Sequence, residues 1–333
     1  MDEMKHRVRV EIDLKALVRN YRKIVAHVKP MKVLCVLKAD AYGHGAVQVS
    51  RMLQTLGADY LAVSSMDEAM ELRNQGITMP ILILGHTPKE QVAKLIELQI
   101  TQAVTCQAKA LEYSAEAVRH SGTLTVHIKV DTGMSRLGYL CDGEHFETGV
   151  ENICADCALP GLNTEGIFTH FAVADEPGGD SGADTQAQLA LFRKVVAAVE
   201  EKRGTKFAIR HCANTGAVAC YPESYMDMVR PGLLLYGYGD GGECLTIADK
   251  NEVWEFEILG EGPHKIGAVW AAQRIPDNHV GVNCNIPRIG KLQYNNPDYF
   301  MFSPNCEKVA RKYGLWDGKE EFVFWKAFNT AWA

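Results

Sequence analysis

Short apolar runs and helical patterns alternate along the first 240 residues of the chain. Residues 33–37 (VLCVL) form an apolar run without a polar position, which is typical of a strand buried on both faces. Between such runs, apolar residues recur every three or four positions, as on one face of a helix. This spacing predicts helices over residues 46–56, 66–74, 90–98, 108–120 and 185–203. The runs predict strands over residues 33–37, 60–63, 81–84, 102–104, 125–130, 164–168, 207–211 and 226–229.

Short strands separated by helices over about 200 residues favour an α/β fold, a (β/α)8 barrel of the TIM type. An open doubly wound sheet is the alternative, but no G-x-G-x-x-G follows the first strand of the alternating region. In a barrel, chemistry gathers at the carboxyl ends of the strands. Polar residues at those ends are therefore the candidates for a functional site.

A separate strand is predicted near the N-terminus. Val8, Val10 and Ile12 alternate with charged residues, as in a half-buried strand. Asp13 can cap the helix that follows, and Pro30 ends that helix.

The composition changes near residue 240, where glycines at positions 237, 239, 241 and 242 predict a flexible seam. Beyond it, residues 253–258 alternate like a strand, and residues 266–270 are its predicted hairpin partner. All five tryptophans lie in this last segment. The sequence thus predicts two domains, a barrel over residues 1–240 and a smaller α+β fragment over residues 241–333.

Composition and charge exclude several classes of function. The formal net charge of −6 predicts no basic surface for nucleic acid. No apolar run approaches the ~20 residues that span a bilayer, and the polar N-terminus has no signal-peptide core. Cys154 and Cys157 form a single C-x-x-C without the second pair or the histidines of a zinc site. We expect no metal site, and reduced thiols in a cytoplasmic protein.

Lys38 directly follows the apolar run 33–37, in the stretch VLKADAYGHG. At the end of a buried strand its amine is partly desolvated, which lowers its pKa and favours covalent chemistry with a carbonyl group. The hydroxyl of Tyr42, four residues further on, can reach a phosphate held by backbone N–H groups. The alternative is a lysine that extends to solvent beside a tyrosine in a turn.

Further polar motifs follow other predicted strands. The motif VHIKVDTGMSRLG carries Lys129 and Arg136, two cations that repel each other unless an anion lies between them or both face solvent. Read alone, each motif is also consistent with ordinary structural or surface residues. The motifs GIFTH, HCANT and VRPGL contribute His170, Asn214, Thr215, Arg230, Gly232 and Leu233.

Together these motifs resemble the N-terminal domain of the alanine racemases, over roughly residues 6–240 or about 70% of the chain. The resemblance implies a fold-type III barrel that binds pyridoxal 5′-phosphate (PLP). It implies an isomerase that interconverts L- and D-alanine, with serine as a second substrate left open. It also implies a homodimer.

The resemblance assigns the residues that hold the cofactor. Lys38 matches the lysine that binds PLP covalently, and Tyr42 matches the tyrosine that contacts the phosphate. The Thr215 hydroxyl stands where the family usually has serine, and it completes a phosphate cup with two backbone N–H groups. The implied cofactor-binding set is Lys38, Tyr42, His170, Asn214, Thr215, Arg230, Gly232 and Leu233.

The resemblance also implies how the substrate and the pyridine ring are held. Lys129 matches a lysine that is commonly carbamylated in the family and orients Arg136 toward substrate and cofactor. Arg230 matches the arginine that faces the pyridine nitrogen, and His170 lies close to the ring and helps to hold that arginine. Because arginine keeps its proton at working pH, the ring nitrogen stays unprotonated, which suits reversible proton exchange. The catalytic residues implied are Lys38, Arg136, His170 and Arg230.

The likeness to the racemases ends at the glycine seam. Racemisation needs an acid or base on each face of the α-carbon, and in the family a tyrosine of the C-terminal domain serves the face opposite the lysine. Tyr238 superficially resembles that tyrosine, but it lies only six residues after Gly232, whereas the family places its tyrosine well downstream. We therefore expect impaired racemisation, and a strand over residues 8–12 without its usual sheet.

Residues 245–329 instead resemble part of a thiol dipeptidase family whose nucleophile is an N-terminal cysteine. The likeness lies in stretches such as LTIADKNEVWEFEI and NPDYFMFSPN. Because this segment begins in mid-chain, Cys244 and Cys284 are expected to be ordinary thiols, with Arg274 and Asn283 as polar groups on the substrate side. Two family likenesses joined at one seam are typical of a fusion, whether natural, engineered or a misassembled gene.

The sequence leaves three functions open. The first is a PLP-dependent alanine racemase. The second is a PLP-binding protein with little turnover, because one proton-transfer group is missing. The third is a thiol dipeptidase, which we disfavour because no cysteine here becomes a free N-terminus by the usual route.

Overall fold

The chain is described by a computed structural model. It describes residues 8–10, 12–237, 256–258, 300–301 and 323–324. The chain divides into two compact units, one over Leu14–Asp249 and the other over Met1–Asp13 with Lys250–Ala333. Each unit is considered by itself.

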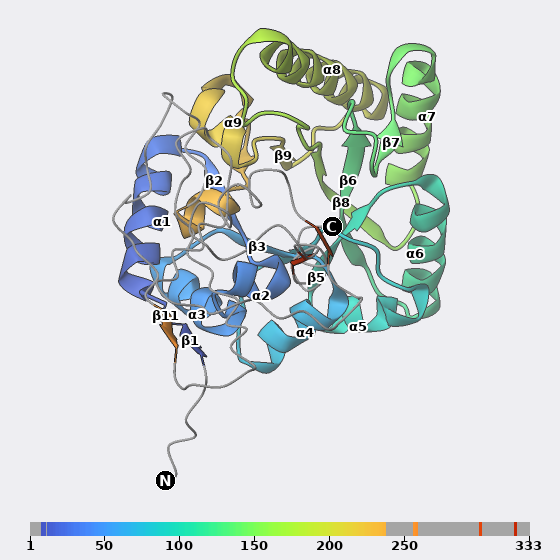
Figure 1. The fold of residues 1–333 in the computed structure, drawn as a ribbon. Coiled ribbons are helices and arrows are strands. Elements are labelled where there is room, and N and C mark those ends of the chain that lie inside the picture. Colours follow the sequence, from blue (N-terminus) through green and yellow to red (C-terminus); the bar gives the residue numbers. More distant parts are fainter. Residues whose placement is uncertain (1–7, 11, 238–255, 259–299, 302–322, 325–333) are drawn as a thin grey trace. The chain divides into compact units, whose positions relative to one another are not determined.

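A ring of parallel strands forms the centre of the larger unit (Figure 1). The strands follow the order β10-β2-β3-β4-β5-β6-β8-β9, and the short β7 (Tyr139–Leu140) pairs with β6 outside this path. The strands are β2 (Lys32–Val36), β3 (Tyr60–Val63), β4 (Ile81–Ile83), β5 (Ile100–Val104), β6 (Leu124–Asp131), β8 (Leu162–Phe168), β9 (Ile209–His211) and β10 (Met228–Val229).

The ring is closed between its last two strands. The Asp227 N–H donates to the Arg210 carbonyl at 3.1 Å, and the Arg230 N–H donates to the Ala213 carbonyl at 2.8 Å. These bonds join β10 to β9, while β10 pairs with β2 on its other side. The predicted (β/α)8 barrel is confirmed.

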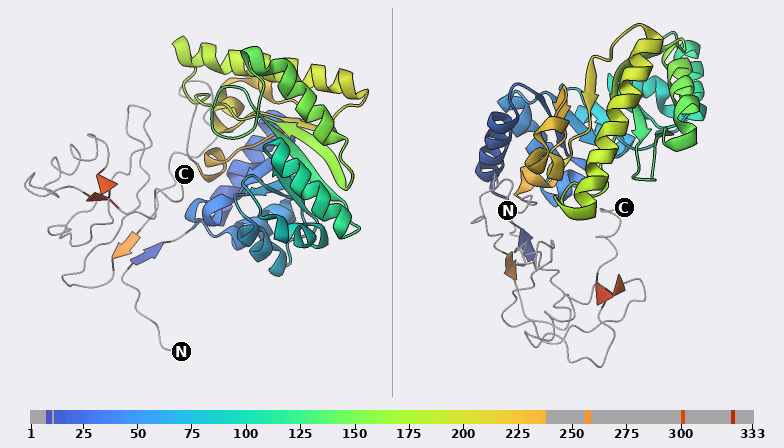
Figure 2. Two further views of the ribbon diagram at one scale, coloured as in Figure 1. Left: turned by 90° about the vertical axis from the view of Figure 1, so that its right-hand side faces the viewer. Right: turned by 90° about the horizontal axis from the view of Figure 1, so that it is seen from above.

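Helices cover the outside of the barrel (Figures 1 and 2). The helices of this unit are α1 (Leu14–Val28), α2 (Lys38–Gly43), α3 (Ala46–Leu56), α4 (Met66–Asn74), α5 (Val92–Glu97), α6 (Gln107–Arg119), α7 (Phe146–Cys157), α8 (Gly179–Arg203) and α9 (Thr215–Cys220), and the short α2 lies at the end of the barrel rather than on its outside. Short 3₁₀ segments are η1 (Lys89–Gln91), η2 (Gly143–His145), η3 (Pro222–Ser224) and η4 (Leu233–Tyr236). Figure 2 shows α6, α7 and α8 running along the outer face of the strands.

The apolar pattern predicted these elements closely. All eight predicted barrel strands are present, and the helices over 46–56 and 66–74 have the predicted bounds. The helix predicted over residues 185–203 starts earlier, at Gly179, because polar residues there follow no apolar spacing. The short α2 was not predicted.

Both faces of the barrel strands are buried. Alternate residues of a strand point to opposite faces. Leu34 and Val36 join an inward cluster with Tyr60, while Val33 and Cys35, between them, are buried on the outward face. This two-sided burial explains why the barrel strands are continuous apolar runs.

The described residues of the smaller unit form short antiparallel strand pairs. Strand β1 (Val8–Val10) pairs with β11 (Phe256–Ile258), with Val8 opposite Ile258, and β12 (Phe300–Met301) pairs with β13 (Val323–Phe324). The N-terminal strand was expected to be without its usual sheet, and it pairs here with residues of the C-terminal segment.

Several predictions lie outside the described residues: the hairpin partner over 266–270, Tyr238, Cys244, Cys284, Arg274 and Asn283. Among the helices that the structure describes, none is both long and apolar enough to cross a membrane.

Candidate cofactor and catalytic site

The predicted site residues gather at the carboxyl ends of the barrel strands. Lys38 comes two residues after β2, and Lys129 lies within β6, two residues before its end. His170 follows β8, Thr215 follows β9, and Arg230 directly follows β10. Because parallel strands of a barrel end at one face, residues far apart in sequence come together there.

The turn after Lys38 has an uncommon backbone conformation. Ala39, Asp40, Ala41 and Tyr42 have φ angles of 53° to 55°, so that α2 contains a left-handed helical turn. For residues other than glycine this conformation costs about 1–2 kcal/mol each. The Asp40 carboxylate offsets part of that cost by accepting a hydrogen bond of 2.7 Å from the N–H of Ala46.

The Lys38 amine lies in this partly buried setting. Burial lowers the pKa of Lys38, the nearby Arg136 lowers it further, and the Glu68 carboxylate opposes both effects. The Nζ atom lies 5.9 Å from the centroid of the Tyr42 ring. A lysine with a lowered pKa has more neutral amine at neutral pH, which is the form that attacks a carbonyl.

Hydroxyl and backbone groups converge beside Lys38, and we call Tyr42, Thr215 and Gly232 the anion cup. The Thr215 hydroxyl accepts hydrogen bonds from the N–H of Gly232 at 3.1 Å and of Leu234 at 3.3 Å. A Cβ atom added to Gly232 would lie 2.8 Å from the Tyr42 hydroxyl, so any side chain at that position would enter the cup. Leu233 begins the 3₁₀ segment η4 directly after Gly232.

Asn214 acts on the anion cup indirectly in this structure. Its side chain caps α9 by accepting a hydrogen bond of 3.1 Å from the Ala217 N–H, and it donates to the Phe171 carbonyl at 3.4 Å. Asn214 is therefore the residue that fixes the start of α9, where Thr215 stands.

Arg230 is buried and surrounded by hydrogen-bond acceptors. One guanidinium nitrogen donates to the Thr169 carbonyl at 2.7 Å and contacts His170 Nδ1 at 3.3 Å. The other lies 3.1 Å from His211 Nδ1. Burial lowers the pKa of Arg230 to about 10, so the side chain is charged at neutral pH.

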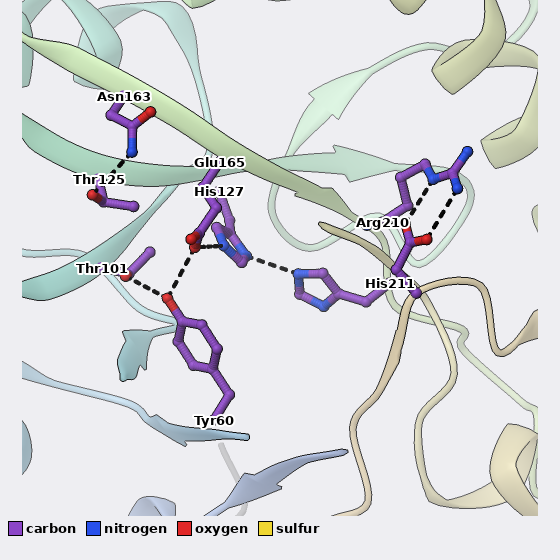
Figure 3. A network of polar contacts seen from close by, with 9 residues as sticks. Tyr60, Thr101, Thr125, His127, Asn163, Glu165, Arg210 and His211 are labelled. Carbon is purple, nitrogen blue, oxygen red and sulfur yellow. Dashed lines mark hydrogen bonds and ion pairs between the residues drawn. The ribbon is translucent and has the colours of Figure 1, made fainter. Parts of the chain in front are cut away.

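A chain of hydrogen bonds runs from Arg230 into the barrel, and we call Arg230, His211, His127 and Glu165 the arginine chain. His211 Nε2 lies 2.9 Å from His127 Nδ1, and His127 Nε2 lies 2.9 Å from a Glu165 oxygen (Figure 3). Glu165 also accepts from the Tyr60 hydroxyl at 3.1 Å. The chain joins a buried cation to a carboxylate whose side chain is 30% exposed.

The chemistry of arginine determines every proton in the arginine chain. A guanidinium can only donate, so His211 Nδ1 accepts and His211 carries its proton on Nε2. That proton points to His127 Nδ1, so His127 carries its own proton on Nε2 and donates it to Glu165. A second proton on either ring would place two N–H groups face to face. Burial lowers the pKa of both histidines, which keeps the rings neutral.

A second ion pair near the arginine chain is separate from it. Arg210 contacts Asp227 through two nitrogens, at 2.7 and 3.0 Å (Figure 3). This pair joins β9 to the residues before β10. The barrel therefore contains both a structural ion pair and the arginine chain, which ends at the candidate site.

Lys129 and Arg136 are placed by one turn. The Asp131 carboxylate accepts hydrogen bonds from the N–H groups of Gly133, Ser135 and Arg136, at 2.9 to 3.0 Å, and so folds the loop after β6. Lys129 Nζ donates to the Leu137 carbonyl of that loop at 3.2 Å. Burial is the main cause that lowers the pKa of Lys129 to about 7, and the positive charge of Arg230 lowers it further. The negative charge of Asp131 partly opposes both effects.

The pKa of His170 reflects the positive charge of the whole site. Its pKa lies well below the ordinary value, first because of burial and then because of four cations, namely Arg230, Lys129, Arg136 and Lys38. Four cationic side chains near one imidazole make a site that favours anionic groups such as phosphate and carboxylate.

Several groups of the site were not assigned from the sequence: Glu68, His127, Asp131, Glu165 and His211. Signals for some of them are present. In the stretch TVHIKVD, the polar residues His127, Lys129 and Asp131 alternate with apolar ones, which places them on one face of a strand. The spacing of Ser65 and Glu68 is that of a capping box at the start of a helix.

Comparison with known proteins identifies the family of this chain. The family described as "Alanine racemase, N-terminal domain" matches residues 12–240. The alanine racemase of Desulforamulus reducens is 43% identical over 235 residues, covering 70% of this chain and 61% of its own length. The alanine racemase of Methanococcus maripaludis is 41% identical over 236 residues, with 70% of this chain and 60% of its own length covered.

Solved structures agree with this match. The alanine racemase of Clostridium difficile 630 in complex with cycloserine superposes with a TM-score of 0.65 at 35% identity, covering 71% of this chain and 63% of that one. The alanine racemase of Bartonella henselae, with covalently bound pyridoxal phosphate, has a TM-score of 0.63 at 26% identity, covering 73% and 64%.

The fold and the site define a parallel (β/α)8 barrel with a lysine and an anion cup at its carboxyl end. The chain belongs to the alanine racemase N-terminal domain family. It spans about 61% of the length of the relatives it matches. A second family, described as "Peptidase family C69", matches residues 228–332, as the resemblance of the C-terminal segment to thiol dipeptidases indicated.

Proposed function

We propose that this chain binds PLP on Lys38 and exchanges the α-proton of alanine, as an isomerase of the alanine racemase kind. The observation that carries the proposal is the convergence of a partly buried lysine amine, an anion cup and a buried arginine at one end of a barrel. Each group matches one part of the cofactor. The family match and the relatives named alanine racemase support the same reaction.

The residues present fit PLP. The Lys38 amine would hold the aldehyde carbon, the anion cup would hold the phosphate, and Arg230 would face the ring nitrogen. The close approach of Tyr42 to Gly232 favours a site shaped for an anion, because a Cβ atom would fill it. When bound, the cofactor supplies the electron-withdrawing ring that makes the α-proton acidic.

Lys38 and Arg136 would act on the substrate, and Lys129 would orient Arg136. Lys38 moves a proton to and from one face of the α-carbon, and Arg136 attracts the carboxylate. Lys129, with a pKa of about 7, has enough neutral amine to add to CO₂. In that step a C–N bond forms, the amine loses a proton, and the resulting carbamate is an anion that can orient Arg136.

Whether proton exchange leads on to full inversion of the α-carbon is a separate proposal. Lys38 serves one face of the α-carbon, and residues 228–332 match a different family from the barrel. We infer two domains, residues 1–240 and 241–333, and proton exchange that is faster than inversion. A PLP-binding protein with little turnover is the limiting case. A cytoplasmic homodimer with alanine, or serine, as substrate is inferred from the family.

Reduction with borohydride tests the cofactor site. Peptide mapping after reduction should place the pyridoxyl group on Lys38. Lys38→Ala should abolish the label, whereas Lys32→Ala, at an exposed lysine in the strand that precedes Lys38, should retain it. A label on another lysine, or no label in the parent protein, would refute the proposal.

Isotope exchange tests the reaction. Each enantiomer of alanine is incubated with the protein in deuterated water, and label uptake is compared with optical rotation. We expect D-alanine to gain deuterium with little inversion, because Lys38 acts on one face. A well-placed acid on the second face is worth about 10²–10⁴ in rate. Rapid inversion from both enantiomers would contradict one-faced exchange and indicate a second base in this chain.

A further inference from the structure

Glu68 links two strand-end turns of the barrel, although it lies on α4 and not on a strand. One carboxylate oxygen accepts a hydrogen bond of 2.7 Å from the N–H of Ala39. The other accepts from the N–H of Ser64 at 2.7 Å and from its hydroxyl at 2.9 Å. Both oxygens are therefore occupied, one by the turn after β2 and one by the turn after β3.

This link begins where the sheet ends. The last hydrogen bond between the neighbouring strands β2 and β3 runs from the Leu37 N–H to the Ala62 carbonyl, at 2.7 Å. Two residues further along each chain, Ala39 and Ser64 are joined through the Glu68 carboxylate. Ala39 is also the first left-handed residue after Lys38. Glu68 thus holds the strained turn at the point where the chain leaves the sheet.

The position of Glu68 is itself determined by its helix. Glu68 is the third residue of α4, and its N–H donates to the side chain of the N-cap residue Ser65 at 3.4 Å. In an ordinary capping box the glutamate would bond back to the N-cap residue. Here the carboxylate reaches one residue further back, to Ser64, and across to Ala39.

The charge of Glu68 also acts on Lys38. The charged groups that act on the pKa of Lys38 are Arg136, from the loop after β6, and Glu68, from α4. The charge of Lys38 in turn lowers the pKa of His170, at the end of β8, and the Tyr42 ring of α2 lies 5.9 Å from the amine. Glu68 is the carboxylate among them, and it raises the pKa of Lys38 while burial and Arg136 lower it.

We propose that Glu68 is a positioning residue for Lys38: its carboxylate clamps the left-handed turn behind the lysine and is the local counter-charge of the amine. The inference rests on the proposed role of Lys38 in holding the cofactor. It predicts two separable effects, one that follows the negative charge and one that follows the reach of the side chain to Ala39.

The charge is tested on the protein without cofactor. Acylation of Lys38 with a limiting amount of acetic anhydride, followed across pH by mass spectrometry, gives the midpoint of its titration. Glu68→Gln removes the charge that raises the pKa of Lys38, so it should move this midpoint downward and raise the neutral fraction of the amine at pH 7. Asp67→Asn removes an exposed carboxylate from the same turn of α4 and should leave the midpoint unchanged.

The clamp is tested on the cofactor-loaded protein by the rate of PLP loss during dialysis against hydroxylamine. Glu68→Ala should lose PLP at least about tenfold faster than the parent, because the turn behind Lys38 is no longer held. Glu68→Asp keeps the charge but is one methylene shorter. It should lose PLP faster than the parent while retaining the parent titration midpoint of Lys38.

The outcomes separate this inference from the proposed function. If Glu68→Gln and Asp67→Asn share the parent midpoint and Glu68→Asp shares the parent PLP-loss rate, the positioning role is overturned. Such a result leaves labelling of Lys38 by borohydride intact. If the parent is not labelled on Lys38, the proposed function fails whatever the Glu68 variants show. If Glu68→Ala does not fold, the conservative Gln and Asp variants decide both effects.

Discussion

The two ends of the site are built on different physical principles. The anion cup uses neutral donors, two hydroxyls and backbone N–H groups, and Tyr42 and Thr215 are partly exposed. The arginine chain uses a buried cation, two neutral imidazoles and a carboxylate, and His127 and His211 have no exposed surface. A hydroxyl rotor can adapt to its partner, whereas each proton of the arginine chain has one allowed place.

This contrast indicates where substitutions will be tolerated. A group that keeps a hydroxyl can replace Thr215, because the hydroxyl hydrogen rotates to suit its surroundings. No common residue replaces His211, because it must accept at Nδ1 and donate at Nε2 in the same ring. Sensitivity to substitution should therefore be greatest along the arginine chain and smallest in the anion cup.

The largest effect is expected from His211→Leu. The change leaves a guanidinium nitrogen of Arg230 and His127 Nδ1 without their partner and separates a buried cation from its carboxylate. Breaking a buried charged network in this way costs about 3–5 kcal/mol in the free energy of unfolding. Urea denaturation measures it. A decrease in the free energy of unfolding below about 1 kcal/mol, the size of one ordinary hydrogen bond, would show that the arginine chain does not depend on this imidazole.

The pH dependence of stability tests the neutral state of the same histidines. The pKa values of His127, His170 and His211 are lowered in the folded protein, so below pH 6.5 the unfolded chain binds more protons than the folded one. The contribution of these histidines to the free energy of unfolding is fully present above about pH 6.5. It falls as the pH decreases, by up to about 1.4 kcal/mol per pH unit for each histidine. Urea midpoints between about pH 7.5 and 5.5 measure the slope, and a flat profile would contradict neutral rings.

Thr215 offers a matched pair of substitutions in the anion cup. Thr215→Val removes the acceptor of the Gly232 and Leu234 N–H groups, at a cost of about 1–3 kcal/mol in stability. Thr215→Ser retains the hydroxyl and should cost less than about 1 kcal/mol. PLP affinity, measured by fluorescence titration, should follow the same order. Equal losses in the two variants would show that the methyl group, and not the hydroxyl, is what matters.

A smaller effect than that of Thr215→Val is expected from Gly232→Ala. The added Cβ atom would lie 2.8 Å from the Tyr42 hydroxyl, so the tyrosine must shift by a fraction of an ångström and PLP affinity should fall. Overpacking of this kind costs about 1–3 kcal/mol, at the low end when the obstructing atom is the tip of a side chain. Tyr42→Phe relieves the contact, so the penalty for Gly232→Ala should shrink when both substitutions are combined. If Gly232→Ala lowers PLP affinity equally with and without Tyr42→Phe, the Tyr42 hydroxyl does not contact position 232.

Much of the fold follows from local patterns in the sequence. The apolar run before Lys38 and the equally apolar run over Tyr60–Val63 indicate strands buried on both faces, and the helical spacing between them indicates βα units. Such patterns are local, because a strand or helix buries side chains at a fixed period. The turn after Lys38 is different. Four left-handed residues without glycine run against local preference, and groups distant in sequence such as Glu68 hold them.

Short motifs along the chain predicted the class of the barrel and the candidate groups at its strand ends, because such residues carry their chemistry in stretches such as VLKADAYGHG. How those groups interact became visible in the packed barrel. Glu165 and His211 are separated by 46 residues, yet the His127 imidazole joins them, and that proximity exists only once β6, β8 and β9 lie side by side. Periodicity sets which face a residue points to, whereas a hydrogen-bond partner is set by the packing of elements distant in the chain.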